Sequence, residues 1–108
     1  MEPLTLQQFK QMLSNDPTHL EVLDVRTKEE HHAKRISGAK NIPLDLLERA
    51  FKTSKNPKTI IVHCAHGFRA KKAAEYLEKS LNLSVYYLKG DIENWEDVGL
   101  PVLYGDEL

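Results

Sequence analysis

Short apolar runs alternate with amphipathic segments along the chain, which is the pattern of strands interleaved with helices. Two segments carry apolar residues at spacings of three and four and predict helices, one beginning near Thr5 and one spanning Phe68–Leu81. Thr5 also has Gln8 three residues after it, which is the spacing of a capping box. Thr27 and Glu30 repeat this spacing, so a further short helix is expected there.

Three runs of apolar and β-branched residues predict strands at 20–25, Thr59–His63 and 84–88. Thr59–His63 is almost continuously apolar, which is typical of a central parallel strand covered on both faces. The remaining expectations are a turn with a short extended piece at 36–43, a helix at 44–51 and a short helix around Trp95. This order predicts an α/β fold with a small, mainly parallel sheet of about four to five strands, flanked by helices on both faces.

Composition limits the kinds of protein this can be. With 108 residues the chain is long enough for a single domain, 1–108, and 41% hydrophobic with 29% charged residues argue against general disorder. A net charge of −1 provides no field for nucleic acid or an anionic membrane, so neither is an expected partner. The apolar runs are too short to cross a bilayer, and the first residues lack the features of a signal peptide. We therefore expect a cytoplasmic protein, with a monomer as the simplest state.

The one cysteine of the chain, Cys64, stands between the most apolar strand and the clearest helix. Ligands of parallel sheets bind outside the carboxyl ends of the strands. The tight connection through Ala65, His66 and Gly67 would point backbone N–H groups into one concavity at a helix N-terminus, where a thiolate is stabilised. A free cysteine is also often a small buried packing residue. The position alone leaves both interpretations open.

Four stretches, taken together, resemble the single-domain form of the rhodanese (sulfurtransferase) family. They lie in the family's order and extend over nearly the whole chain. The stretches are Leu-Asp-Val-Arg-Thr at 23–27 with Glu29 and Glu30, Ile-Ser-Gly-Ala-Lys-Asn-Ile-Pro at 36–43, the C-x-x-G-x-R-A loop at 64–70, and Tyr-Leu-Lys-Gly at 87–90 with Trp95 and Gly-Leu-Pro-Val at 99–102.

The resemblance implies that Cys64 accepts a sulfane sulfur as a persulfide and passes it to a nucleophilic acceptor. Thiosulfate is the family's usual donor, and cyanide or a thiol is the acceptor, so small molecules are the expected partners. No metal and no organic cofactor are implied. Backbone N–H groups of the loop would surround the persulfide sulfur. The residues of this expected cradle are Ala65, His66, Gly67, Phe68, Arg69 and Ala70.

Several charged residues near this loop are candidates for supporting it. Arg69 either binds the anionic donor or braces the loop through Asp24, since both would lie at the carboxyl edge of the sheet. We expect Asp24 to support the loop and not to transfer protons. Arg26 is expected to brace the fold through Glu29 or Glu30.

His63, Cys64 and His66 are of residue types that bind metal ions. Strand alternation would send His63 to the face opposite Cys64, and no fourth ligand is evident, so a zinc site is not expected. His66 either contacts the donor or faces solvent. His31 is expected at an exposed helix end. Phe68 is a candidate for the pocket mouth. Trp95 is expected in the core beneath the last helix.

Two other functions remain open. One is a sulfur-carrier or interaction module that receives persulfide sulfur from a partner protein in a sulfur relay. The other is a phosphatase or arsenate reductase, which the loop length disfavours. Four residues separate Cys64 from Arg69, one fewer than in the C-x5-R loop of those related enzymes.

Overall fold

The computed structural model describes residues 2–15, 19–50, 59–65, 67–81, 84–88 and 95–107. Some predicted positions lie outside the described residues: His66 of the loop, Lys89 and Gly90 after the third predicted strand, and residue 51 of the helix expected at 44–51. No helix in these ranges is both long enough and apolar enough to cross a membrane.

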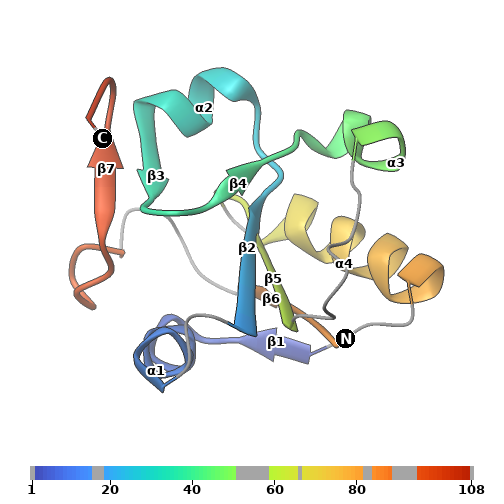
Figure 1. Cartoon of the computed structure of the whole chain (residues 1–108), viewed down its shortest axis with the longest axis horizontal. Helices are drawn as coiled ribbons and strands as arrows, with labels where there is room; N and C mark the ends of the chain where they lie inside the picture. Colours follow the sequence, from blue (N-terminus) through green and yellow to red (C-terminus); the bar gives the residue numbers. More distant parts are fainter. Residues whose placement is uncertain are drawn as a thin grey trace.

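A five-stranded sheet with all neighbouring strands parallel forms the centre of the molecule, in the order β1-β6-β5-β2-β4 (Figure 1). Its strands are β1 (Glu2–Leu4), β2 (Leu20–Asp24), β4 (Lys40–Asn41), β5 (Thr59–His63) and β6 (Val85–Leu88). The most apolar strand, β5, is the central one, as its sequence predicted, and Ile61 and Val62 are fully buried. A strand covered on both faces exposes no side chain to water, so its sequence is apolar throughout instead of alternating.

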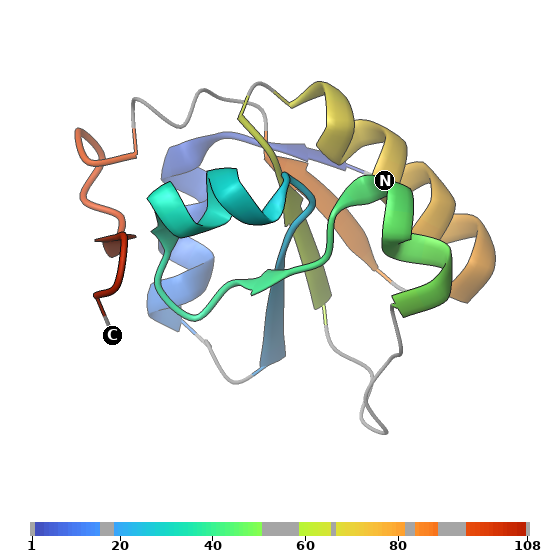
Figure 2. The same cartoon turned by 90° about the horizontal axis from the view of Figure 1, so that it is seen from above.

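Helices cover both faces of the sheet (Figure 2). One hydrophobic cluster joins β2 and β5 to α4 (Phe68–Leu81), and the other joins them to α1 (Leu6–Asn15). Both predicted capping boxes form, at Thr5 before α1 and at Thr27 before α2 (Lys28–Ala33). The chain after β4 continues through a 3-10 turn, η2 (Leu44–Leu46), into α3 (Leu47–Ala50). The predicted α/β architecture is therefore confirmed, including the helix bounds of α4.

Other parts of the fold differ from the expectation. The chain begins with an edge strand, β1, and β3 (Lys34–Ile36) pairs antiparallel with β7 (Val102–Tyr104) in a separate two-stranded sheet. Neither short strand has a distinctive pattern, and the β3–β7 pairing joins distant parts of the sequence. The short helix expected around Trp95 is wrong for the described residues 95–99, which form turns. Trp95 is nevertheless fully buried, in the cluster that contains α1.

The register of the sheet decides which residues meet at its carboxyl edge. Asp24 at the end of β2 lies opposite His63 at the end of β5. Val25 donates its N–H to the His63 carbonyl at 3.1 Å, and Leu44 donates its N–H to the Val25 carbonyl at 3.1 Å. These bonds set the residues that follow β2, β4 and β5 side by side, with Cys64 next to Val25.

Candidate active site

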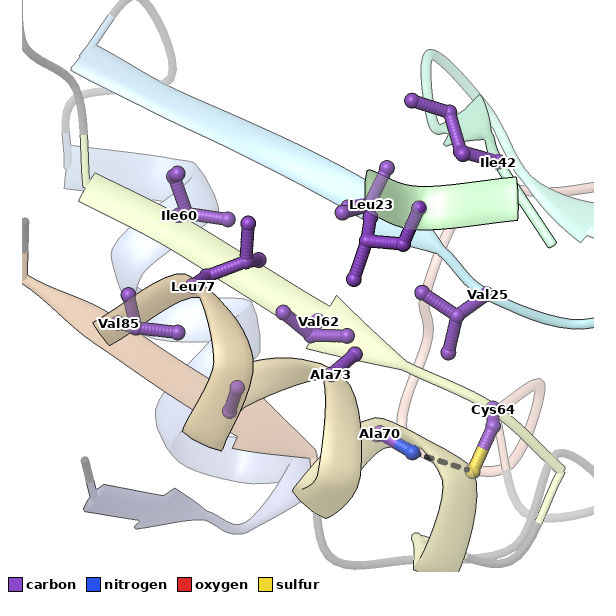
Figure 3. Close-up of a cluster of buried hydrophobic side chains, with 12 residues drawn as sticks. Leu23, Val25, Ile42, Ile60, Val62, Cys64, Ala70, Ala73, Leu77 and Val85 are labelled. Atoms are coloured by element: carbon purple, nitrogen blue, oxygen red, sulfur yellow. Dashed lines mark hydrogen bonds between the residues drawn. The ribbon is translucent and has the colours of Figure 1, made fainter. Parts of the chain in front are cut away.

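Cys64 follows directly after β5 and points to the α4 side of the sheet, with 2% of its surface exposed. Figure 3 shows it at the end of the cluster formed by β2, β5 and α4, close to Ala70 in the first turn of the helix. Ile60 and Val62 of β5 face the same cluster, so strand alternation continues into Cys64. The sulfur therefore lies where the central strand of the sheet ends and α4 begins.

Within the described part of the loop and helix, two backbone N–H groups converge on this sulfur. Gly67 donates to Cys64 Sγ at 3.0 Å and Ala70 at 3.3 Å, the second contact being drawn in Figure 3. Gly67 has a φ of 89°, a conformation that side-chain-bearing residues rarely adopt, and this turns the chain back over the sulfur. Both donors lie at the N-terminus of α4, where the helix dipole adds positive potential. Donors in these positions would stabilise negative charge on the sulfur.

The other described members of the expected cradle lie differently. Ala65 is half-buried, whereas the Phe68 side chain is 69% exposed and has the Lys72 ammonium 4.8 Å from its ring centroid. Phe68 therefore lies on the surface beside the loop. It is not among the residues that line the two pockets described below, and its place at a pocket mouth stays a prediction.

Arg69 forms an ion pair near the loop, but the prediction that its partner is Asp24 is wrong. Its two terminal nitrogens bind the two carboxylate oxygens of Glu30 at 2.7 and 2.9 Å. Hydrogen bonding from Arg69 lowers the pKa of Glu30 to about 2, and the same bond raises the pKa of Arg69. Glu30 also accepts the Thr27 N–H to close the capping box of α2. One carboxylate thus links the starts of α2 and α4.

Asp24 is not available to Arg69 because nearer donors occupy it. This fully buried carboxylate accepts from Arg26 Nε at 3.0 Å and from Arg26 Nη2 at 2.8 Å, so the expected pairing of Arg26 with Glu29 or Glu30 is also wrong. His31 Nδ1 lies 2.7 Å from Asp24 Oδ2, and His31 is half-buried instead of fully exposed. Burial by itself raises the pKa of Asp24, but the hydrogen bonds from Arg26 and His31 and the electrostatic effect of His63 outweigh it and lower the pKa overall. Asp24 therefore ties the end of β2 to α2.

His63 lies on the face opposite Cys64, as strand alternation predicted. Its ring is fully buried and makes an edge-on contact with Trp95, with 4.9 Å between ring centroids. Burial lowers the pKa of His63 to about 4, so the ring is neutral near pH 7. Across the described ranges, no three or more His, Cys, Asp or Glu side chains are grouped so that they could hold a metal ion.

A pocket of about 380 Å³ opens beside the loop. Its lining residues come from the segments that follow β2 and β4, from η2 and from α4: Val25, Thr27, Pro43, Leu44, Asp45 and Arg69. A second pocket, of about 200 Å³, shares Thr27, Pro43 and Asp45 with the first. Glu30, Leu44 and Asp45 were not predicted to lie at this site, although the capping-box position of Glu30 was a usable signal.

This fold and loop define a known class. The chain belongs to the rhodanese-like domain family, whose model matches residues 5–98. The resemblance inferred from the four sequence stretches is therefore confirmed.

Three proteins of similar sequence show how far the resemblance extends. YqhL of Bacillus subtilis, an uncharacterised protein, is 32% identical over 69% of this chain and 60% of its own length. The putative sulfur carrier protein YrkF of the same organism is 32% identical over 85% of this chain and 49% of its own length. The thiosulfate sulfurtransferase GlpE of Actinobacillus succinogenes is 30% identical over 75% and 73%. This chain thus spans only about half to three-fifths of the first two relatives.

A solved structure of similar extent is that of a rhodanese-related protein from Thermoplasma volcanium. It has a TM-score of 0.78 and 30% identity, with 95% of this chain and 98% of that chain covered.

Proposed function

We propose that this domain is a sulfurtransferase that carries a sulfane sulfur on Cys64 and passes it to a nucleophilic acceptor. The observation that carries the proposal is the convergence of the Gly67 and Ala70 N–H groups on Cys64 Sγ. Membership of the rhodanese-like family and the name of the relative GlpE support the same chemistry.

Two displacements at sulfur make up the proposed reaction. The Cys64 thiolate attacks the outer sulfur of a donor such as thiosulfate, the donor's S–S bond breaks, and sulfite leaves with the electron pair. An acceptor such as cyanide or a thiolate then attacks the outer sulfur of the persulfide, and Cys64 leaves as a thiolate. The negative charge is on Cys64 Sγ in the free thiolate and on the outer sulfur in the persulfide. Fixed N–H donors at this end of the loop would stabilise the charge in both states.

Mass spectrometry of the intact protein tests the persulfide. After treatment with thiosulfate, we expect a gain of one sulfur atom that cyanide removes and that Cys64→Ser lacks. Lys72→Ala, which changes an exposed residue near the loop, is the matched control and should gain the sulfur normally. A wild-type protein that gains no sulfur at any donor concentration would contradict the proposal.

A sulfur-carrier role is the second candidate, and the name of the relative YrkF favours considering it. A carrier would turn over slowly with thiosulfate and cyanide but would accept sulfur quickly from the persulfide of a partner protein, such as a cysteine desulfurase. Comparing these two rates on one preparation distinguishes the carrier from the enzyme.

Phosphatase activity is expected to be negligible. Besides the short loop, the Arg69 guanidinium is held by both oxygens of Glu30 and is not free to bind a phosphate. Hydrolysis of a small aryl phosphate that disappears in Cys64→Ser would show this exclusion to be wrong.

A further inference from the structure

The pocket beside the loop is next to Cys64 in the fold. Val25 and Cys64 follow neighbouring strands and belong to the same buried cluster, and Leu44 packs against it. Arg69, which also lines the pocket, precedes the Ala70 whose N–H reaches the sulfur. Cys64 does not itself line the pocket, but two lining residues, Val25 and Leu44, belong to or pack against the cluster that contains it.

The size of this pocket fits an organic molecule. Its volume of about 380 Å³ falls within the range of pockets that bind organic ligands. Cyanide and thiosulfate are much smaller and would leave most of it unfilled. Val25, Pro43 and Leu44 supply apolar walls, which suit a carbon skeleton better than an inorganic ion.

The charges around this pocket do not favour an anion. Among the described residues that line it, Arg69 is the one cation, and it is neutralised by two bonds to Glu30. In the adjoining pocket Lys28 is balanced by Glu29. The remaining charge among the described lining residues is the exposed carboxylate of Asp45, which borders both pockets. Asp45 therefore gives this side of the site a net negative charge.

We propose that this pocket binds the sulfur acceptor, and that the acceptor is a small organic thiol carrying an ammonium group that Asp45 attracts. The inference rests on the proposed function of Cys64. The acceptor's thiolate attacks the outer sulfur of the Cys64 persulfide, the S–S bond breaks, and Cys64 leaves as a thiolate. The product is the organic persulfide, and the exchange needs no oxidant or reductant.

Three acceptors of similar size and different charge test the assignment: cysteamine, 2-mercaptoethanol and 3-mercaptopropionate. Cys64 is first loaded with sulfur from thiosulfate, and the rate of transfer to each thiol is measured in wild type and in Asp45→Asn. Each thiol is compared with itself across the variants, so differences in thiol nucleophilicity cancel. We expect Asp45→Asn to slow transfer to cysteamine about threefold, leave 2-mercaptoethanol unchanged and speed 3-mercaptopropionate.

Two further variants sharpen the result. Glu48→Gln removes an exposed carboxylate of α3 that does not line either pocket, and it should leave all three rates unchanged. Asp45→Glu keeps the charge and should keep the preference for cysteamine.

The outcomes separate the two proposals. If Asp45→Asn changes all three rates equally, or if Glu48→Gln has the same effect, the pocket assignment is overturned while sulfur transfer through Cys64 stands. If wild-type Cys64 takes up no sulfur, the proposed function fails and the acceptor assignment fails with it.

Discussion

At the scale of single residues, the site depends on residues that serve two structural roles at once. Glu30 caps α2 through the Thr27 N–H and holds Arg69 with both oxygens. Gly67 provides both a positive φ and an N–H bond to sulfur. Such residues link local backbone geometry to the chemistry of Cys64, so conservative substitutions can separate their two roles.

Replacing Glu30 with Gln should change donor binding more than folding. Glutamine still accepts the Thr27 N–H, but it removes the charge that neutralises Arg69. We expect the KM for thiosulfate to fall about threefold at low ionic strength and the difference to shrink as salt is added. Steady-state kinetics at two salt concentrations measure this, with the exposed Glu75→Gln on α4 as the control. A raised KM would mean instead that Arg69 must be held by Glu30 to bind the donor.

Replacing Gly67 with Ala should impair sulfur loading beyond its cost in stability. A side chain at a φ of 89° costs about 1–2 kcal/mol and would shift the N–H that faces Cys64 Sγ. We expect loading from thiosulfate, followed by intact mass, to slow at least tenfold. Gly38 has a similar φ of 85° and nothing within 4 Å of an added Cβ, so Gly38→Ala controls for strain alone. Equal loading rates in the two variants would rule out a specific role for Gly67.

At the scale of elements, the close approach of α4 to the sheet determines where the loop lies. Ala70, Ala73 and Ala74 are fully buried on the face of α4 that meets β5. Small side chains let the helix approach closely, which brings its first N–H groups within reach of the sulfur at the end of β5. The packing of the helix and the geometry of the site are therefore coupled.

Enlarging this face tests that coupling. Ala73→Leu should lower the free energy of unfolding by about 1–3 kcal/mol, because a close-packed interior has no room for the added atoms. The midpoint of urea unfolding measures the change. Glu75→Leu on the exposed side of the same helix should cost less than about 0.5 kcal/mol. If Ala73→Leu were equally mild, the helix would not be held as closely as the structure shows.

At the scale of the whole molecule, two hydrophobic clusters cover the two faces of the sheet. Ionisable groups are buried at the carboxyl edge of this sheet. Asp24 and His63 face each other across β2 and β5 and are both fully buried. Global stability should therefore depend on pH through groups that take no part in the proposed chemistry.

His63 should make the fold less stable in mild acid. Its pKa is near 6.5 in the unfolded chain and about 4 in the fold, so between these values the unfolded state binds more protons. The stabilisation is complete above pH 6.5 and is lost as the pH falls toward 4, by up to about 3 kcal/mol. Urea unfolding at pH 7, 5.5 and 4.5 measures this loss. His63→Phe, which keeps an aromatic ring against Trp95, should lose less stability, and an identical decline in both proteins would assign the effect elsewhere.

The sequence by itself determined the fold class and the place of Cys64, the proposed reactive thiol, in that fold. The apolar run of β5, the alanine face of α4 and the two capping boxes are local signals, because each depends on residues within one element. Cys64 became a candidate through its place between such a strand and such a helix, and the resemblance of its loop to the rhodanese family supplied the expected role. The glycine three residues later was enough to predict a tight loop.

Only the tertiary structure decided which charged residues meet. Arg69 pairs with Glu30 and not with Asp24. The Asp24 carboxylate is already bound by Arg26 and His31. The acceptor pocket likewise depends on the register that places Leu44 beside Val25, far apart in the sequence. Ion pairs and pocket walls are set by side-chain distances between elements, and the residue pattern within each element does not specify those distances.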